Sequence, residues 1–288
     1  MSKTIIGYGK SYASFGEVVQ GRLSSQEDFL VTLPVDMWST CELHYKEING
    51  PSVVEVDLEK SRKVAESMLQ SLVKDYGAHI KIKFSRNIPI GKGLSSSTAD
   101  MLSVVRAFQE VFGVIVGESF ISRLFNSIEP HDGLHYYTSV VYNHRRGVLL
   151  NRLNYIPDFK IIGVDFGGEV CTELYNRNVV FTDALVEAYD ELYADLLTSF
   201  SMRDDRMIAN CATRSLQLHI KRTGLPSLSS ALIRARKLNV LGVLVAHSGT
   251  CVGFILPGET PDHLIRKVSH DVRDLGDVFV TRTLKMLD

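Results

Sequence analysis

The sequence lacks the features of several common classes of protein. Its four cysteines, Cys41, Cys171, Cys211 and Cys251, are widely spaced and form no metal-binding pair. No apolar run approaches the roughly 20 residues that span a bilayer, and no apolar core of a signal peptide follows Lys3. The formal net charge is -1 without a long basic segment, which argues against a nucleic-acid surface. We therefore expect a cytoplasmic protein that binds neither membrane nor nucleic acid.

What is present is an ordinary globular balance, with 23% charged and 45% hydrophobic residues in a chain of 288. Strand-like and helical segments are mixed, and this order predicts an α+β fold in two layered halves. Among these segments, residues 58–76 predict a helix that ends at Gly77, and residues 136–142 predict a strand. The apolar pattern loosens over residues 153–159, so we expect one domain over residues 1–155 and a second over 156–288. The near-neutral charge makes a homodimer compatible with the sequence without predicting one.

The most informative segment is residues 89–99, Pro-Ile-Gly-Lys-Gly-Leu-Ser-Ser-Ser-Thr-Ala. Alternating residues 79–84 before it predict a strand, and apolar residues at helical spacing predict a helix from about Ser97. A glycine-rich loop before a helix presents unpaired N–H groups and the positive end of the helix dipole, which favours a bound phosphate. The alternative is an ordinary corner with a serine N-cap. Four consecutive hydroxyl residues exceed what a cap requires.

A second group of polar residues follows the next predicted helix, which spans residues 121–128. Glu129 and Asp132 are two carboxylates at a junction between helix and loop, although Asp132 and Gly133 are also typical of a simple turn. His131 and His135 are four residues apart, which invites a metal-site interpretation. Neighbouring proline and glycine disfavour a regular helix there, so the two imidazoles need not share a face.

Three further segments carry weaker signals. Residues 16–21 predict a tight turn in which the backbone approaches a neighbour closely. Asp36 is equally compatible with a turn and with a ligand contact. Residues 243–255 predict a hairpin whose small, hydroxylated turn could approach a phosphate. Two nucleotide motifs are excluded at the N-terminus: Thr4 occupies the first glycine position of a Walker A loop, and Tyr12 occupies the third of a dinucleotide fingerprint.

Residues 89–99 resemble the phosphate loop of the GHMP kinases, in which Pro-x-x-x-Gly-Leu is followed by small and hydroxylated residues. Within that family the sequence is most similar to the L-threonine kinases of cobalamin side-chain synthesis. The matching pieces are residues 13–21, 34–40, 129–133 and 246–250, which spread over most of the chain. One departure is Tyr12, where the threonine kinases usually carry proline.

The resemblance implies a fold with an N-terminal domain like the second domain of ribosomal protein S5 and a ferredoxin-like C-terminal domain. It also implies ATP and Mg²⁺ as cofactors, and transfer of the γ-phosphoryl to a small hydroxy amino acid. The substrate would be free L-threonine, or alternatively L-serine or homoserine. Other open alternatives are a metal-dependent hydrolase using His131, Asp132 and His135, and a nucleotide-binding protein without turnover.

Carried over residue by residue, the resemblance implies specific roles. Asp132 would accept or orient the proton of the substrate hydroxyl, and Ser97 and Glu129 would bind Mg²⁺. The residues expected at the nucleotide are Pro89, Gly91, Lys92, Gly93, Leu94, Ser95, Ser96, Ser97 and Thr98. The residues expected at the substrate are Ser14, Glu17, Asp36, Gly249 and Thr250, with Glu17 as the candidate for an ammonium group. A substrate carboxylate requires a cation, and the candidates are Arg22, Arg145, Arg146 and Arg214.

Overall fold

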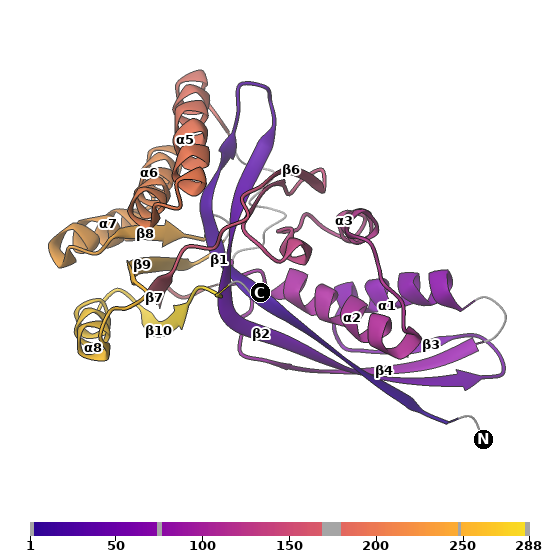
Figure 1. Cartoon of the computed structure of the whole chain (residues 1–288). Coiled ribbons are helices and arrows are strands. Elements are labelled where there is room, and N and C mark those ends of the chain that lie inside the picture. Colours follow the sequence, from indigo (N-terminus) through magenta and orange to yellow (C-terminus); the bar gives the residue numbers. More distant parts are fainter. Residues whose placement is uncertain (1–2, 74–76, 169–179, 247–248, 286–288) are drawn as a thin grey trace.

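The computed structural model describes residues 3–73, 77–168, 180–246 and 249–285. Its frame is a ten-stranded sheet whose main path runs β10-β7-β9-β8-β1-β2-β4-β3. Two long antiparallel strands, β1 (Ile5–Arg22) and β2 (Asp28–Ile48), connect the two halves of the molecule. Figure 1 shows their shared hairpin standing upright between the helices of the N-terminal half and those of the C-terminal half.

The N-terminal half packs helices against the shared ends of β1, β2 and β4. Its elements are β3 (Val53–Glu55), α1 (Glu59–Leu72), β4 (Gly77–Arg86), α2 (Ser96–Phe112), α3 (Glu118–Asn126), the 3-10 turn η1 (Leu134–Tyr136), β5 (Val140–Asn143) and β6 (Val148–Arg152). Helix α2 lies directly on β1, because a Cβ at Gly7 or Gly9 would overlap backbone atoms of Ala107 or Ser103. These N-terminal glycines therefore serve helix packing, which agrees with the exclusion of a nucleotide motif there.

The C-terminal half continues the sheet through an antiparallel set of strands. Its elements are β7 (Phe159–Asp165), α5 (Asp183–Ser201), α6 (Asp205–Thr223), α7 (Pro226–Leu238), β8 (Gly242–Val245), β9 (Cys251–Pro257), α8 (Asp262–Asp271) and β10 (Asp277–Arg282). The large core lies under β1, β2 and α2, and a smaller core lies between β7–β9 and helices α7 and α8. The predicted α+β architecture is confirmed. The division at residue 155 stays a prediction, since the sheet is continuous across it.

Most predicted elements are present, and three predictions were wrong. Gly77, expected to end the helix before it, is the first residue of β4, while α1 ends at Leu72. The strand expected over residues 136–142 is reduced to β5, preceded by η1. Residues 16–21 form no turn but a part of β1 with shifts in register, although the predicted close approach is present, since a Cβ at Gly16 would lie 2.7 Å from the Val245 carbonyl oxygen. The expected hairpin is confirmed as β8 and β9, with its residues 247 and 248 outside the described ones.

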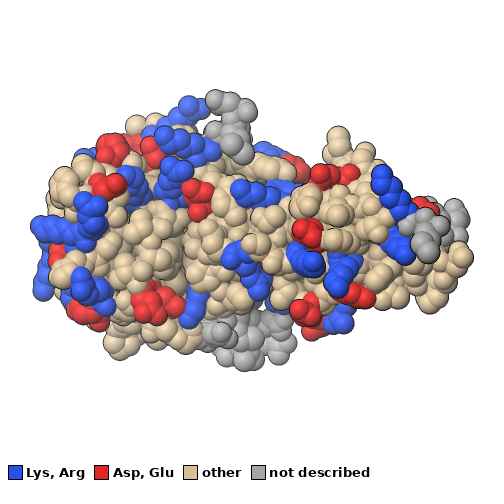
Figure 2. All heavy atoms as spheres, turned by 90° about the horizontal axis from the view of Figure 1, so that it is seen from below, with Lys and Arg blue, Asp and Glu red and all other residues tan. Residues whose placement is uncertain are grey.

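The surface mixes charges of both signs. In the view of Figure 2, acidic and basic side chains are interspersed over the face seen from below. Within the described ranges, no helix combines the length and apolar character that crossing a membrane requires.

Candidate active site

Three segments that are distant in the sequence meet at the N-terminus of α2. A Cβ at Gly93 would lie 2.5 Å from the Cβ of Ala246, and a Cβ at Gly249 would overlap the carbonyl of Lys92. The loop before α2 therefore packs backbone against backbone on the turn between β8 and β9. Strand β1 joins them, because Glu17 pairs with Val245 of β8. The structure thus brings together the segments singled out around residues 17, 93 and 249.

The loop has the backbone expected of an anion-binding turn. Gly91 and Gly93 have positive φ angles of 71° and 77°, and Ser95 is left-handed at 58° without a side-chain cap. The first N–H groups of α2, from Ser96 onward, have no acceptor within the helix. Leu94 is buried in the core and anchors this loop. The strand, loop and helix predicted around residues 89–99 are therefore present, whereas their role toward ATP stays a prediction.

The two residues expected to bind Mg²⁺ are in direct contact. The Ser97 hydroxyl donates to Oε1 of Glu129, and the ammonium of Lys60 lies on Oε2 of the same carboxylate. The Glu129 side chain is only 8% exposed. Magnesium prefers oxygen ligands and keeps several waters, so one hydroxyl and one carboxylate are a sufficient protein contribution beside phosphates. Ser97 and Glu129 therefore fit a magnesium ion. The Glu129 carboxylate already attracts a cation here, the ammonium of Lys60.

Asp132 lies next to the same helix N-terminus. Its carboxyl accepts hydrogen bonds from the side chains of Ser95 and Thr98. Burial, the nearby Glu17 carboxylate and Glu129 raise the pKa of Asp132 to about 7, although the two hydrogen bonds oppose that rise. A carboxyl with a pKa near neutrality is suited to exchange a proton at physiological pH.

A buried network supports the loop that carries Asp132. The imidazole of His131 accepts at Nδ1 from the Gly133 N–H at 3.4 Å, and its Nε2 lies 2.9 Å from the Tyr142 hydroxyl. Burial lowers the pKa of His131 to about 4, so the ring is neutral. The Tyr12 hydroxyl donates to the Leu134 carbonyl at 2.6 Å and ties β1 to the same loop. The sequence did not indicate this supporting role for His131.

The metal-site interpretation of the histidines finds no support. His135 is occupied by the Ser122 hydroxyl at 2.9 Å, and burial lowers its pKa to about 3. Among the described residues, no group of three or more His, Cys, Asp or Glu side chains is arranged to hold a metal ion. Within that part of the chain, the hydrolase alternative therefore lacks the metal centre that it requires.

An ion pair not indicated by the sequence links the two halves at this site. Lys92 lies 2.8 Å from Asp165 at the end of β7 and donates to the Gly168 carbonyl at 2.6 Å. The Thr250 hydroxyl donates to the other Asp165 oxygen at 2.5 Å. Burial would raise the pKa of Asp165, but the hydrogen bonds from Lys92, Thr250 and Gly167 outweigh it and lower the pKa. Asp165 thereby connects both segments expected to border the nucleotide.

Two predicted substrate residues make other contacts. The buried Ser14 hydroxyl donates to the Gly16 carbonyl at 2.9 Å and accepts from the Leu33 N–H at 2.9 Å, so it braces the register shift in β1. Asp36 accepts from the Trp38 indole at 2.7 Å and pairs with Arg282 at 3.1 Å. Among the described residues, the structure shows no contact between Asp36 and the group formed by Glu17, Asp132 and the loop before α2.

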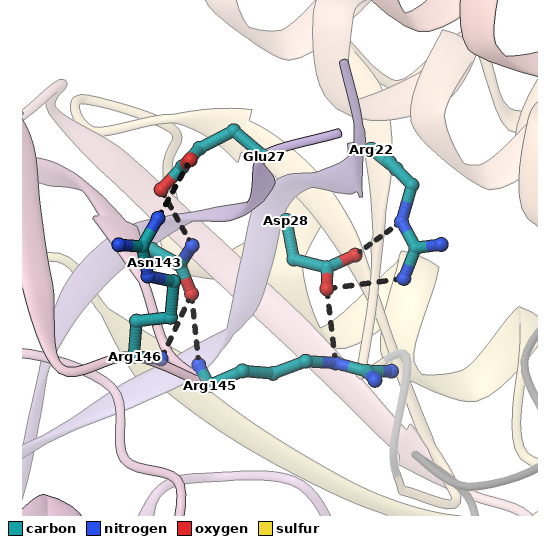
Figure 3. A network of polar contacts seen from close by, with 6 residues as sticks. All are labelled: Arg22, Glu27, Asp28, Asn143, Arg145 and Arg146. Atoms are coloured by element: carbon teal, nitrogen blue, oxygen red, sulfur yellow. Dashed lines mark hydrogen bonds and ion pairs between the residues drawn. The ribbon is translucent and has the colours of Figure 1, made fainter. Parts of the chain in front are cut away.

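Three of the four candidate arginines lie in one network, where the turn between β5 and β6 meets the β1–β2 hairpin (Figure 3). Arg22 makes two bonds to Asp28, at 2.8 and 3.1 Å, and Arg145 approaches the same carboxylate at 3.3 Å. Arg146 pairs with Glu27 at 3.3 Å on the same hairpin. Arg214 pairs instead with Asp195, which connects α6 to α5.

A glycine-rich corner at a helix N-terminus thus lies beside a hydroxyl–carboxylate pair, an arrangement suited to a phosphate and a metal ion. Residues 62–135 match the family model described as "GHMP kinases N terminal domain". The resemblance to the GHMP kinases expected from the motifs is therefore confirmed.

The chain is also similar to individual kinases. An L-threonine kinase from Salmonella typhimurium is 24% identical over 262 residues, which cover 87% of this chain and 83% of the relative. An L-threonine kinase from Citrobacter freundii is 27% identical, covering 85% of this chain and 84% of the relative. The solved structure of a homoserine kinase from Cytophaga hutchinsonii is similar in fold, with a TM-score of 0.72 at 14% identity, covering 98% and 96% of the two chains.

Proposed function

We propose that the protein is an ATP-dependent kinase that transfers the γ-phosphoryl to the side-chain hydroxyl of free L-threonine and forms O-phospho-L-threonine. The observation that carries the proposal is the position of Asp132. Its carboxyl lies at the N-terminus of the phosphate-loop helix and close to the second carboxylate of Glu17. The L-threonine kinases from Salmonella and Citrobacter, similar over most of the chain, support the choice of substrate.

Phosphoryl transfer requires mainly positioning and neutralisation of charge. Backbone N–H groups at the start of α2 would hold the phosphates, with Gly249 and Thr250 on the opposite side. Ser97 and Glu129 would hold Mg²⁺, which neutralises charge on the phosphates when bound. Asp132 would orient the threonine hydroxyl and accept its proton.

Glu17 accounts for the amino acid character of the substrate. The proximity of Glu17 raises the pKa of Asp132, so an ammonium group placed beside these carboxylates would lower that pKa again. Binding of the correct substrate would thus convert Asp132 into its ionised, proton-accepting form. A hydroxy acid without an ammonium group would not produce this effect.

The test is an ADP-release assay with Mg-ATP and a panel of L-threonine, L-serine, L-homoserine and mevalonate. We expect turnover with L-threonine and a phosphomonoester product identified by ³¹P NMR. A preference for L-serine or homoserine would move the assignment to another small alcohol of the same class. Absence of ADP release with every member of the panel would refute the kinase proposal.

A further inference from the structure

Lys60 reaches from the surface to the centre of the site. It is the second residue of α1, a helix that is buried through Val64, Ala65, Met68 and Leu69. The Lys60 side chain is 43% exposed, yet its ammonium contacts the nearly buried carboxylate of Glu129. The contact therefore places a partly exposed cation directly on a candidate metal ligand.

The position of the Lys60 ammonium indicates what it could do when nucleotide binds. Lys60 lies on one oxygen of Glu129, while the Ser97 hydroxyl donates to the other. A metal ion held by Ser97 and Glu129 would meet the lysine at the same carboxylate, and two cations there would repel each other. A lysine carries its charge on a flexible four-carbon stem, so it can leave the carboxylate for a phosphate oxygen nearby.

Two other cations near the loop before α2 are paired with other groups. Lys92 is held by Asp165 and by the Gly168 carbonyl. Arg86 is bound to Asp100 on α2. Of these three cations, Lys60 is the one whose partner is itself a candidate metal ligand.

We propose that Lys60 is a further phosphate-binding residue of this site. Its ammonium holds Glu129 in the nucleotide-free protein and moves to the terminal phosphate when Mg-ATP binds. There it counters the charge on the phosphoryl group in transfer. The inference rests on the proposed kinase function, but its first test needs no turnover.

The first test compares Lys60→Met with Lys63→Met in the full chain. Lys63 lies one turn further along α1 and pairs with Glu59 at the surface, so it is a matched control. In nucleotide-free protein, titration with Mn²⁺ should show several-fold tighter binding to Lys60→Met, because a competing cation is gone. A non-hydrolysable ATP analogue should bind about 10-fold more weakly, while ADP binding changes little. Lys63→Met should match the wild type in all three measurements.

Turnover provides the second test. Lys60→Met should lower kcat with L-threonine by about 10- to 100-fold, which is less than the roughly 100- to 1,000-fold loss typical of removing a buried group that stabilises a transition state. Lys60→Arg should retain most of the activity, because the charge remains. Unchanged affinity for the ATP analogue, or weaker Mn²⁺ binding, would overturn the proposal and leave Lys60 a structural contact. Wild type that binds the analogue in a Lys60-dependent way but phosphorylates no hydroxyl would refute the kinase proposal alone.

Discussion

Replacing Asp132 with asparagine should abolish turnover and at the same time make the fold more stable at alkaline pH. The carboxyl has an ordinary pKa of 3.8, which the folded protein raises to about 7 through burial and the carboxylates of Glu17 and Glu129. The folded protein therefore disfavours the ionised form that the proposed reaction needs. An asparagine amide is neutral at every pH, so the Asp132→Asn variant would escape this cost.

The magnitude follows from the two pKa values. Each pKa unit corresponds to about 1.4 kcal/mol, so the rise from 3.8 to about 7 sets an upper bound of about 4 kcal/mol. The full cost applies above pH 7, where the carboxyl is ionised in both states. Between pH 7 and 4 the folded protein binds a proton that the unfolded chain does not, so the cost shrinks as pH falls. Below the ordinary pKa it disappears.

Thermal unfolding of wild type and Asp132→Asn at pH 8 and pH 5 measures this effect. Local relaxation reduces the upper bound, so we expect a gain of about 1–3 kcal/mol at pH 8 and a smaller one at pH 5. Each kcal/mol corresponds to about 2–4 °C in Tm for a chain of this size. Asp36→Asn is the opposite control, because the Trp38 hydrogen bond and Arg282 lower the pKa of Asp36. That variant should lose stability at pH 8. An equal gain for Asp132→Asn at both pH values would refute the reasoning.

Three further predictions concern the support of the site. Gly93→Ala should weaken binding of an ATP analogue by at least 10-fold in calorimetry, because the new Cβ would meet Ala246. Gly113→Ala is the control and should bind the analogue normally, because Gly113 has a similar φ angle but no neighbour within 4 Å of the new Cβ. His131→Asn should retain a higher kcat than His131→Ala, since the asparagine amide oxygen can still accept the hydrogen bond from the Gly133 N–H. Asp165→Asn should raise the KM for ATP several-fold with little change in kcat, because it releases Lys92 and Thr250; an equal fall in kcat would contradict a positioning role.

The sequence predicted those parts of the site that are local in the chain. The strand, glycine-rich loop and helix around Gly93 follow from short-range periodicity and from backbone conformations that glycine adopts readily. The same holds for the hairpin of β8 and β9 and for most of the helices. Boundaries were wrong where tertiary contacts override local pattern. Gly77 enters β4 because its backbone lies against Gly50, where a side chain would overlap the carbonyl.

The contacts that complete the site could not be read from local pattern. Asp165 ends a strand like many others, and its partners Lys92 and Thr250 are distant in sequence. Lys60 lies in a helix whose sequence indicates packing only, 69 positions before Glu129. His131 suggested a metal ligand, because a histidine that accepts a backbone hydrogen bond has no distinct sequence signature. Such pairings depend on how distant segments pack together, which short motifs do not specify.

The balance of charge in the site also bears on the class of substrate. Glu17, Asp132 and Glu129 approach one another closely enough to raise the pKa of Asp132, and Lys60 pairs with Glu129. A divalent metal ion compensates the phosphates and Glu129, and a positive group beside Glu17 and Asp132 would favour the ionised form of Asp132. An ammonium-bearing alcohol supplies that charge, whereas an acid such as mevalonate adds another negative one. The relative rates of L-threonine and its deaminated analogue 3-hydroxybutyrate should therefore differ by more than about 10-fold in wild type, and Glu17→Gln should reduce this preference.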